Sequence, residues 1–204
     1  MLELARAEAA DIVVPQEIDS RWLTELEPLK ASMPLVKAVP RDDNFGIGIW
    51  SRVPLGNLRE IESGPFGVPT LTAECEVAGR KLLIVATHPV PPANAEGAAA
   101  RDAQLSELAG LVAQSSIPVI VIGDLNVTPW APAYRRFAQT TGLRNTRQGF
   151  GIIPTWPAQF RWFGIPLDHC LASPELAARD IRAAPSIGSD HFPLIVDLIV
   201  PAAK

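Results

Sequence analysis

The run IPVIVIGD at residues 117–124 constrains the fold more than any other segment of the chain. Every position from 117 to 122 is apolar, without the alternation that a half-exposed strand shows, so the run is typical of a strand buried on both faces. The preceding residues 97–114 are alanine-rich with leucines at helical spacing, which predicts a helix. A buried strand next to a long helix predicts an α/β fold with covered sheets.

Further strands and helices are predicted along the whole chain. Residues 68–77 and 80–88 are two β-like runs that meet at Ala78-Gly79, which indicates a hairpin. The other expected elements are strands at 12–16, 45–51, 165–173 and 193–200, a short helix near the N-terminus, and helices at 19–30 and 131–140. A purely doubly wound sheet would lack hairpins, so the pattern favours two packed sheets with helices outside.

Length and composition indicate one domain, residues 1–204. The 20 prolines and 14 glycines are spread through the sequence, and neither a repeat nor a linker separates two parts. The first residues lack the basic and apolar regions of a signal peptide, and no apolar run approaches the about 20 residues of a membrane span. Two cysteines are too few for a disulfide framework. We therefore expect a cytoplasmic protein, or the soluble part of a membrane-anchored one.

Ionisable residues stand at the ends of several predicted strands. Glu17 follows IVVPQ, His88 ends LLIVATH, and Asp124 ends VIVIG. Asp190 and His191 form a pair in the Gly-Ser turn before the last strand. Polar side chains at the ends of buried strands are well placed to converge at one edge of the sheet, where ligand sites commonly lie. The sequence therefore predicts a functional site built from loop residues.

Each of these residues also has a purely structural interpretation. GDLN (123–126) would serve equally to close a strand with an Asx turn, and Glu17 would serve as a solvated acid. Asp168 in PLDH could cap a strand, and His191 could lie on a surface turn. His169 alternates to the opposite face from Asp168, so we interpret His169 as mainly structural.

Taken together, the residues suit hydrolysis of a phosphoester. A hard cation such as Mg²⁺ needs few carboxylates and keeps several waters, and Glu17 is the best candidate for its ligand. Asp124 could orient or deprotonate a water, and Asn126 could hold the water or the phosphate. His191, as an imidazolium paired with Asp168, could neutralise a phosphate oxygen.

The motifs also resemble a known family. In order along the chain they are DIVVPQE with Glu17, ATHP with His88, GDLN with Asp124 and Asn126, PLDH with Asp168, and GSDHFP with Asp190 and His191. This order and spacing resembles the endonuclease/exonuclease/phosphatase superfamily, with its DNase-I-like fold, from about residue 10 to residue 199. The phrases HPVPP, GDLNVTPW and PTWP look most like a bacterial branch whose members often carry transmembrane helices ahead of the catalytic domain.

The resemblance implies a four-layer α/β sandwich, in which two packed mixed β-sheets are flanked by helices. It implies divalent-metal-dependent phosphoester hydrolysis with Mg²⁺, or with Mn²⁺. Glu17 would bind the metal, and Asp190 would be an acid on the metal side or on the phosphate side. His88 would be a second catalytic histidine. For the acidic partner of His88 the sequence leaves Asp43 and Asn44 open.

One expected element has no counterpart in the sequence. The family's opening strand ends in an asparagine near the metal and the phosphate, but here Met1 stands where the first helix should begin. We therefore expect a domain that lacks this strand, either because the recorded start falls inside a longer reading frame or because the strand was lost. A catalytically weak domain that acts as a binding module is the corresponding alternative function.

The substrate is expected to be a phosphoester of a small molecule, of a lipid-linked group or of a nucleic acid. With 18 basic and 22 acidic residues the formal charge is −4, which disfavours a nuclease without excluding one. The only basic cluster follows GDLN and consists of Arg135, Arg136, Arg144 and Arg147. It would bind a phosphate backbone or a lipid headgroup, or simply form a solvated helix face.

Aromatic residues near the same loops complete the list of candidates. Trp130, Trp156 and Arg161 are expected to contact the substrate. The tryptophans Trp130, Trp156 and Trp162 would wall a pocket or stack on a base, and packing in the core is at least as good an interpretation of them. Proximity to a membrane is expected from the resemblance, and no protein partner is indicated. The chain lacks a G-x-x-x-x-G-K-[ST] loop and a G-x-S-x-G elbow, which disfavours a P-loop nucleotide enzyme and an α/β-hydrolase.

Overall fold

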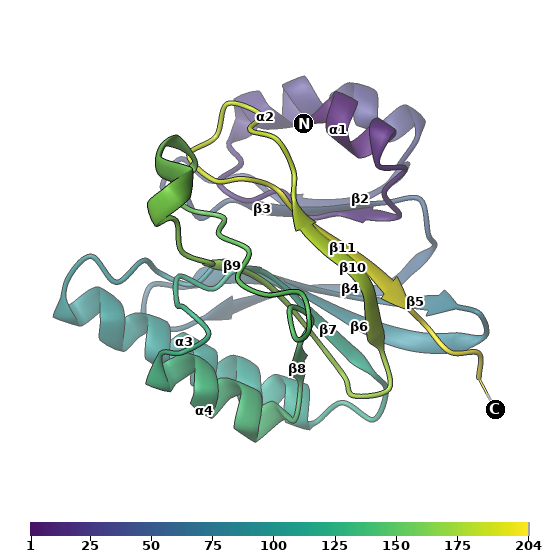
Figure 1. Cartoon of the computed structure of the whole chain (residues 1–204). Coiled ribbons are helices and arrows are strands. Elements are labelled where there is room, and N and C mark those ends of the chain that lie inside the picture. Colours follow the sequence, from purple (N-terminus) through teal and green to yellow (C-terminus); the bar gives the residue numbers. More distant parts are fainter. Residues whose placement is uncertain (204) are drawn as a thin grey trace.

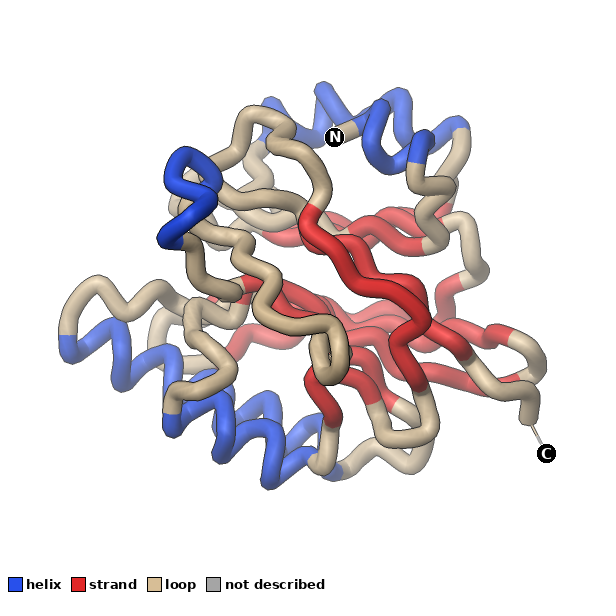
Figure 2. The backbone as a smooth tube through the Cα atoms, in the orientation of Figure 1, coloured by secondary structure: helices blue, strands red, loops and turns tan. Residues whose placement is uncertain are grey.

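The computed structural model describes residues 1–203, and the side chains of Leu35 and Arg161 are outside that description. Two layers of strands lie between two outer layers of helices (Figures 1 and 2). The helices are α1 (Leu2–Ala7), α2 (Ser20–Leu26), α3 (Ala95–Ala113) and α4 (Pro132–Thr141), with 3₁₀ helices η1 (Glu27–Ala31) and η2 (Ala158–Phe163). None of the described helices combines the length and the apolarity needed to cross a bilayer.

The first layer is a six-stranded mixed sheet with the order β4-β5-β6-β7-β9-β8. Its strands are β4 (Leu55–Ser63), β5 (Val68–Val77), β6 (Arg80–Thr87), β7 (Val119–Asp124), β8 (Arg144–Asn145) and β9 (Asp168–Ala172). β6 and β7 are parallel, and all other neighbours are antiparallel. α3 supplies the crossover that a parallel pair requires, and α3 and α4 cover the outer face (Figure 1).

The second layer consists of two antiparallel sheets. One has the order β1-β3-β2 and the other is the pair β10-β11. Their strands are β1 (Ile12–Val13), β2 (Leu35–Val39), β3 (Ile47–Ser51), β10 (Ala177–Ala183) and β11 (Leu194–Ile199). α1, α2 and η1 cover the outer face, where Trp50 of β3 packs with Leu26 and Leu29. The predicted four-layer sandwich is confirmed.

Successive side chains of β3 point to opposite faces, so this strand contributes to two clusters of buried residues. Ile47 and Ile49 of β3 face the six-stranded sheet and pack with Leu71 and Ile84, while Trp50 faces the helices. Ile12 of β1 and Val196 of β11 pack against the same inner cluster, but β1 pairs only with β3 and β11 only with β10 among residues 1–203. The second layer is therefore divided. The absence of an opening strand from the domain stays a prediction.

Several sequence predictions agree with the structure and others missed elements. β7 is buried on both faces as expected, and the turn between β5 and β6 has positive φ at Ala78 and Gly79. Strands β2, β4, β8 and β10 are not among the strands expected from the sequence. β4 is an edge strand with mostly exposed residues, so it lacks the apolar alternation by which a strand is recognised.

Gly123 permits the close approach of β7 to the end of β6. Its φ is +150°, and a Cβ added there would lie 1.8 Å from the carbonyl oxygen of Thr87. Gly123→Ala is therefore expected to lower the free energy of unfolding by more than about 3 kcal/mol, measured by denaturant titration. Gly110→Ala, in α3 with open space around the new Cβ, is the control and should be neutral or stabilising. Equal effects at both glycines would contradict the proposed role of Gly123.

Candidate active site

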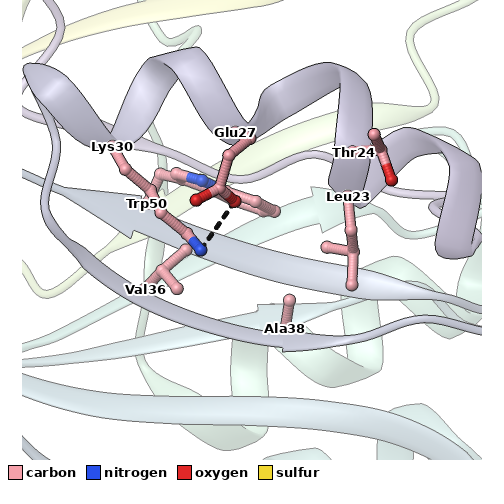
Figure 3. A pocket seen from close by; sticks show the side chains of 7 residues that line it. All are labelled: Leu23, Thr24, Glu27, Lys30, Val36, Ala38 and Trp50. Carbon is pink, nitrogen blue, oxygen red and sulfur yellow. Dashed lines mark ion pairs between the residues drawn. The ribbon is translucent and has the colours of Figure 1, made fainter.

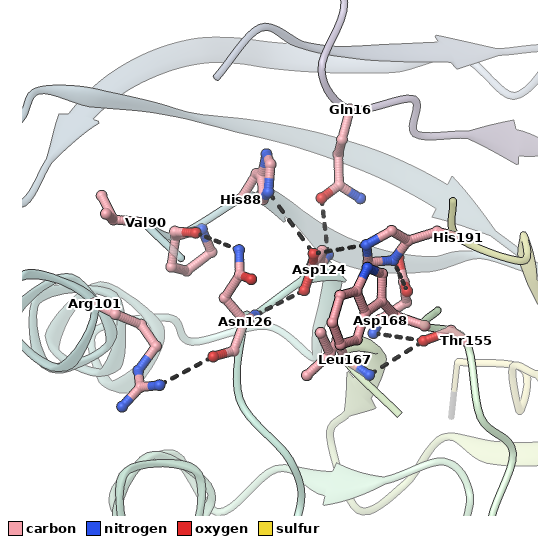
Figure 4. Close-up of polar contacts among 12 residues, drawn as sticks. Gln16, His88, Val90, Arg101, Asp124, Asn126, Thr155, Leu167, Asp168 and His191 are labelled. Carbon is pink, nitrogen blue, oxygen red and sulfur yellow. Dashed lines mark hydrogen bonds and ion pairs between the residues drawn. The ribbon is translucent and has the colours of Figure 1, made fainter. Parts of the chain in front are cut away.

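Four segments bring the predicted side chains to one edge of the six-stranded sheet. β6 and β7 run parallel and end there, with His88 directly after β6 and Asp124 as the last residue of β7. β9 is antiparallel to β7 and begins there, so Asp168 pairs in register with Asp124. His191 reaches the same place from the loop before β11 (Figure 4). The topology therefore gathers residues that are far apart in the sequence.

His191 joins two carboxylates. Its Nδ1 lies 2.8 Å from Oδ2 of Asp168, and its Nε2 lies 3.7 Å from Oδ2 of Asp124. Nε2 of His88 lies 3.8 Å from the same Asp124 oxygen. Figure 4 shows His88 and His191 on opposite sides of Asp124. The predicted pair of Asp168 and His191 is present, and the contacts continue through Asp124 to His88.

The charges in this cluster follow from burial and from close contacts. Burial opposes the charged form of His191, but the hydrogen bond and charge of Asp168 outweigh it and raise the pKa of His191 to about 9. Burial opposes the charged form of Asp168, but the hydrogen bond and the charge of His191, together with the hydroxyl of Thr155, outweigh burial and lower the pKa of Asp168. Burial and then the charge of Asp168 raise the pKa of Asp124 to about 7. At neutral pH the cluster contains an imidazolium, a carboxylate and an acid that is poised to exchange a proton.

His88 is neutral at neutral pH because burial lowers its pKa to about 4. Its Nδ1 has no hydrogen-bond partner of normal geometry in the described structure, although the backbone of Asn44 lies near enough to raise the pKa slightly. Asp43 is held instead by the guanidinium of Arg41 and by the N–H of Phe45. The structure therefore places the backbone of Asn44, and not the carboxylate of Asp43, beside His88.

Gln16 and Thr155 position the two aspartates, and the sequence analysis did not identify either as a site residue. The N–H of Asp124 donates to Oε1 of Gln16 over 2.8 Å. Oγ1 of Thr155 accepts from the N–H groups of Leu167 and Asp168, at 3.1 and 3.2 Å. The only sequence signal for Gln16 was that it precedes Glu17. Both contacts hold the backbone in place at the two residues, Asp124 and Asp168, that carry the carboxylates.

Asn126 turns inward and shapes the loop after β7. Its N–H donates to Oδ1 of Asp124 over 2.7 Å, and its Nδ2 donates to the carbonyl of Pro89 over 2.9 Å. Arg101 of α3 donates to the Asn126 carbonyl over 3.0 Å, a contact that no sequence pattern predicts. The amide of Asn126 is thus partly occupied, and its remaining N–H is what could reach a water or a phosphate.

Backbone in the left-handed region occurs repeatedly around the cluster. Glu17 has φ +57°, Asn44 has φ +66° and Asn126 has φ +50°. Such conformations cost free energy in residues other than glycine and persist where the surrounding structure fixes them. Their position next to the converging side chains is consistent with a functional site.

The two predicted metal ligands lie near enough to repel each other, and the charge of His191 offsets part of this repulsion. Burial and then the charge of Asp190 raise the pKa of Glu17, and Asp168 adds to this. Within the described residues no group of three or more His, Cys, Asp or Glu side chains is arranged to enclose a metal ion. Mg²⁺ does not need such a cage, because it takes one or two carboxylates together with waters and phosphate oxygens. Neighbouring hard-oxygen donors that repel one another therefore fit a divalent cation of this kind.

The candidates for substrate contact have different environments. Nε1 of Trp156 donates to Oδ2 of Asp190 over 3.2 Å, and its ring lies 6.5 Å from that of His191, so Trp156 belongs to the wall of the site. Trp130 is exposed in the loop that follows Asn126. Arg161 lies in η2, but its side chain is outside the described part of the structure.

The predicted basic cluster after GDLN does not form one surface. Arg147 is buried and donates to the carbonyl of Asp168 and to Nδ1 of His169. Arg136 forms an ion pair with Asp102 at 3.0 Å. The cluster is wrong as a phosphate-binding patch, because the chain turns one guanidinium into the core and neutralises another.

His169 has the structural role expected of it. It is buried on the face opposite Asp168, with Nε2 2.8 Å from the carbonyl oxygen of Val127. Burial lowers its pKa to about 3 from an ordinary value of 6.5. Below pH 6.5 the unfolded chain therefore binds a proton that the folded chain refuses, so stability falls as the pH drops.

His169→Gln is expected to weaken this pH dependence. A histidine that stays neutral in the folded protein makes the free energy of unfolding fall by up to about 1.4 kcal/mol per pH unit. This fall occurs between pH 6.5 and the pKa of the histidine in the folded protein. Denaturant titrations from pH 7.5 to pH 4.5 should show a shallower loss of stability for the variant than for the wild type. The value at pH 7.5 gives the cost of the substitution itself. Parallel curves would contradict the assignment of a neutral buried histidine.

One pocket lies away from this cluster. A cavity of about 450 Å³ separates α2 and η1 from β2 and β3, and it is lined by Leu23, Thr24, Glu27, Lys30, Val36, Ala38 and Trp50 (Figure 3). Its charged residues, Glu27 and Lys30, pair with each other at 2.7 Å. With no free acid or base pair, the cavity offers no machinery for catalysis.

Comparison with known proteins identifies related folds. The sequence model of the Endonuclease/Exonuclease/phosphatase family matches residues 1–191. No curated protein sequence matches the chain. The structure of D. rerio TDP2 complexed with a single-strand DNA product is 16% identical with a TM-score of 0.80, and the match covers 97% of this chain and 89% of that one.

Two further solved structures agree. An endonuclease/exonuclease/phosphatase from Bacteroides vulgatus is 17% identical with a TM-score of 0.79, over 98% of this chain and 88% of that one. The human nocturnin catalytic domain with bound sulfate is 24% identical with a TM-score of 0.75, over 97% of this chain and 84% of that one. At these identities the likeness concerns the fold, and it confirms the expected DNase-I-like architecture.

Proposed function

Because the chain belongs to the endonuclease/exonuclease/phosphatase family, we propose that it is a divalent-metal-dependent phosphoester hydrolase, with Asp124, Asp168 and His191 at its reaction centre. Enzymes of this family hydrolyse phosphoesters and in general depend on a divalent metal. The observation that carries the proposal is the continuous series of contacts from Asp168 through His191 to Asp124 and on to His88.

Asp124 orients the attacking water and accepts its proton. The carboxylate is buried at the end of β7, and its Oδ2 faces both histidines. The water oxygen forms a bond to phosphorus while the bond from phosphorus to the leaving oxygen breaks. A base whose pKa lies near neutrality is well suited to this step. The leaving oxygen takes a proton from solvent and departs as an alcohol.

His191 acts on the phosphate as an imidazolium. An in-line displacement places the attacking and leaving oxygens on opposite sides of phosphorus. Since Nε2 of His191 lies 3.7 Å from Asp124, it serves the attacking side and the phosphate oxygens, and not the leaving oxygen. Asp168 fixes the ring and keeps it charged, so we assign Asp168 a positioning role.

Glu17 and Asp190 are the residues that would hold the metal. When bound, Mg²⁺ or Mn²⁺ supplies neutralisation of phosphate charge. Trp156 holds the carboxylate of Asp190 beside His191, and Gln16 holds the segment before Glu17 to the end of β7. Asn126 and the neutral His88 complete the wall around the phosphate.

A substrate screen tests the proposal. The protein would be offered bis(4-nitrophenyl) phosphate, the corresponding monoester, plasmid DNA and a lipid phosphoester, each with and without Mg²⁺. Hydrolysis of at least one substrate that requires Mg²⁺ or Mn²⁺ is expected. Release from the bis-ester alone assigns a diesterase, and nicking of the plasmid assigns a nuclease. A folded protein that hydrolyses none of them is the binding module, and the proposal is then wrong.

A further inference from the structure

Large apolar side chains are exposed around the edge of the sheet that carries the candidate site. Three of them belong to η2, and we define these η2 aromatics as Phe160, Trp162 and Phe163, with 66%, 95% and 86% of their surface exposed. Trp130 and Phe66 are also exposed. Trp130 lies in the loop after β7, and Phe66 lies in the turn before β5, whose first residues pair with the end of β6. Apolar exposure of this extent commonly marks an interaction surface.

The η2 aromatics stand on a projecting loop that is fixed at its base. Trp156 and Ile165 exchange backbone hydrogen bonds of 3.1 and 2.6 Å, which close the loop formed by residues 157–164. Ala158 donates to the carbonyl of Asp190 over 2.7 Å, which ties the loop to the segment that carries His191. Figure 1 shows η2 as a short green coil outside the two layers of strands. The loop therefore holds exposed aromatic side chains beside the segment that carries Asp190 and His191.

We infer that the η2 aromatics insert into the interface of an uncharged or zwitterionic lipid bilayer and place the candidate site over a phosphoester presented by that bilayer. This inference rests on the proposed function for its substrate class, whereas the binding to lipid is independent of catalysis. Tryptophan and phenylalanine are the side chains that gain most from the boundary between lipid headgroups and acyl chains. A projecting group of aromatics suits a fluid phase, because it needs no preformed groove in a partner.

The charges around the site disfavour a polyanion as the occupant. A nucleic-acid backbone is bound by cations that are free to pair with its phosphates. Arg101 is paired with Asp102, and Arg41 is paired with Asp43. Residues 157–164 contain one charged residue, Arg161. The loop is thus rich in apolar surface and poor in charge, which matches a lipid interface better than a phosphate backbone.

The charges of the site and of the whole chain also predict which lipids the protein binds. Glu17 and Asp190 lie at the site, and the whole chain has a formal charge of −4. Attachment to anionic lipid relies on clusters of lysine and arginine, each of which adds attraction to the surface. Binding to phosphatidylcholine vesicles is therefore expected, and the addition of phosphatidylserine should not strengthen it.

Vesicle flotation with the full chain tests the inference. The double variant Trp162→Ser/Phe163→Ser is compared with Ile199→Ser, which removes an exposed apolar side chain from the end of β11, where the strand runs away from His191. The wild type and Ile199→Ser should float with phosphatidylcholine vesicles, and the double variant should bind at least about tenfold more weakly. Its hydrolysis of the soluble bis-ester should stay within about twofold of the wild type.

The outcomes separate the inference from the proposed function. A wild type that fails to float, or a double variant that floats equally well, overturns the inference while hydrolysis of the soluble ester still supports the function. Flotation without any hydrolysis supports the inference on lipid binding and overturns the function. The double variant could instead float normally but lose binding to DNA, or lose a dimer that sedimentation velocity detects in the wild type. Either result would assign the η2 aromatics to DNA or to a second copy of the chain, and would overturn the inference of a lipid interface.

Discussion

Asp124→Asn is expected to lower the rate of phosphoester hydrolysis by at least about 10³-fold while the protein remains folded. The amide has almost the same shape as the carboxylate, and its oxygen can still accept from the N–H of Asn126. It can no longer take a proton from water. Because Asp124 is buried between His88 and His191, no bulk water replaces its function. Steady-state kinetics on the bis-ester with saturating Mg²⁺ measure the effect.

Asp102→Asn provides the matched control for this variant. Asp102 lies on α3 and pairs with Arg101 and Arg136 at the surface, so its loss should change the rate by no more than about twofold. Circular dichroism and denaturant titration check that both variants are folded. If Asp124→Asn retained more than about a tenth of the wild-type rate, Asp124 would not be the base.

His191→Ala is expected to lower the rate by at least about 10²-fold. The substitution removes the imidazolium together with its hydrogen bond to Asp168 and its contact with Asp124. Asp168→Asn should reproduce most of this loss, because Asp168 acts through His191. The two effects should therefore be strongly non-additive in the double variant, which a merely structural role for Asp168 would not produce.

A substitution at His169 distinguishes an effect on catalysis from an effect on packing. His169→Gln changes a buried residue next to Asp168 on β9, but its side chain faces the opposite side of the sheet. It should retain activity within about threefold at neutral pH, where the residue it replaces is neutral. Near-normal turnover of His191→Ala, or additive losses from Asp168 and His191, would contradict the assigned roles.

The buried strands of the fold could be predicted from the sequence because buried positions are occupied by apolar residues. Residues 119–122 of β7 are all apolar because both faces of the strand are covered, and the turn at Ala78-Gly79 is a local signal. β4 could not be recognised, because most of its residues are exposed at the edge of the sheet. The division of the second layer into two sheets also depends on pairing between distant segments, which no local pattern encodes.

The site residues that could be predicted from the sequence are polar residues next to a strand. Asp124, Asp168 and His191 meet as the motif order indicated. Gln16 and Thr155 were missed because each acts on backbone that becomes its neighbour only after folding. The predicted arginine cluster failed for the same reason: neighbours along the chain, such as Arg136 and Arg147, face different surroundings in the folded protein.

The most direct measurement of the central claim is the release of nitrophenol from bis(4-nitrophenyl) phosphate by the wild type and by Asp124→Asn, with Mg²⁺ present and after its removal by a chelator. We predict turnover by the wild type that disappears with the metal and returns when Mg²⁺ or Mn²⁺ is restored, and a rate for Asp124→Asn that is lower by at least about 10³-fold. Turnover that survives the chelator, or that is unchanged in Asp124→Asn, would contradict the account.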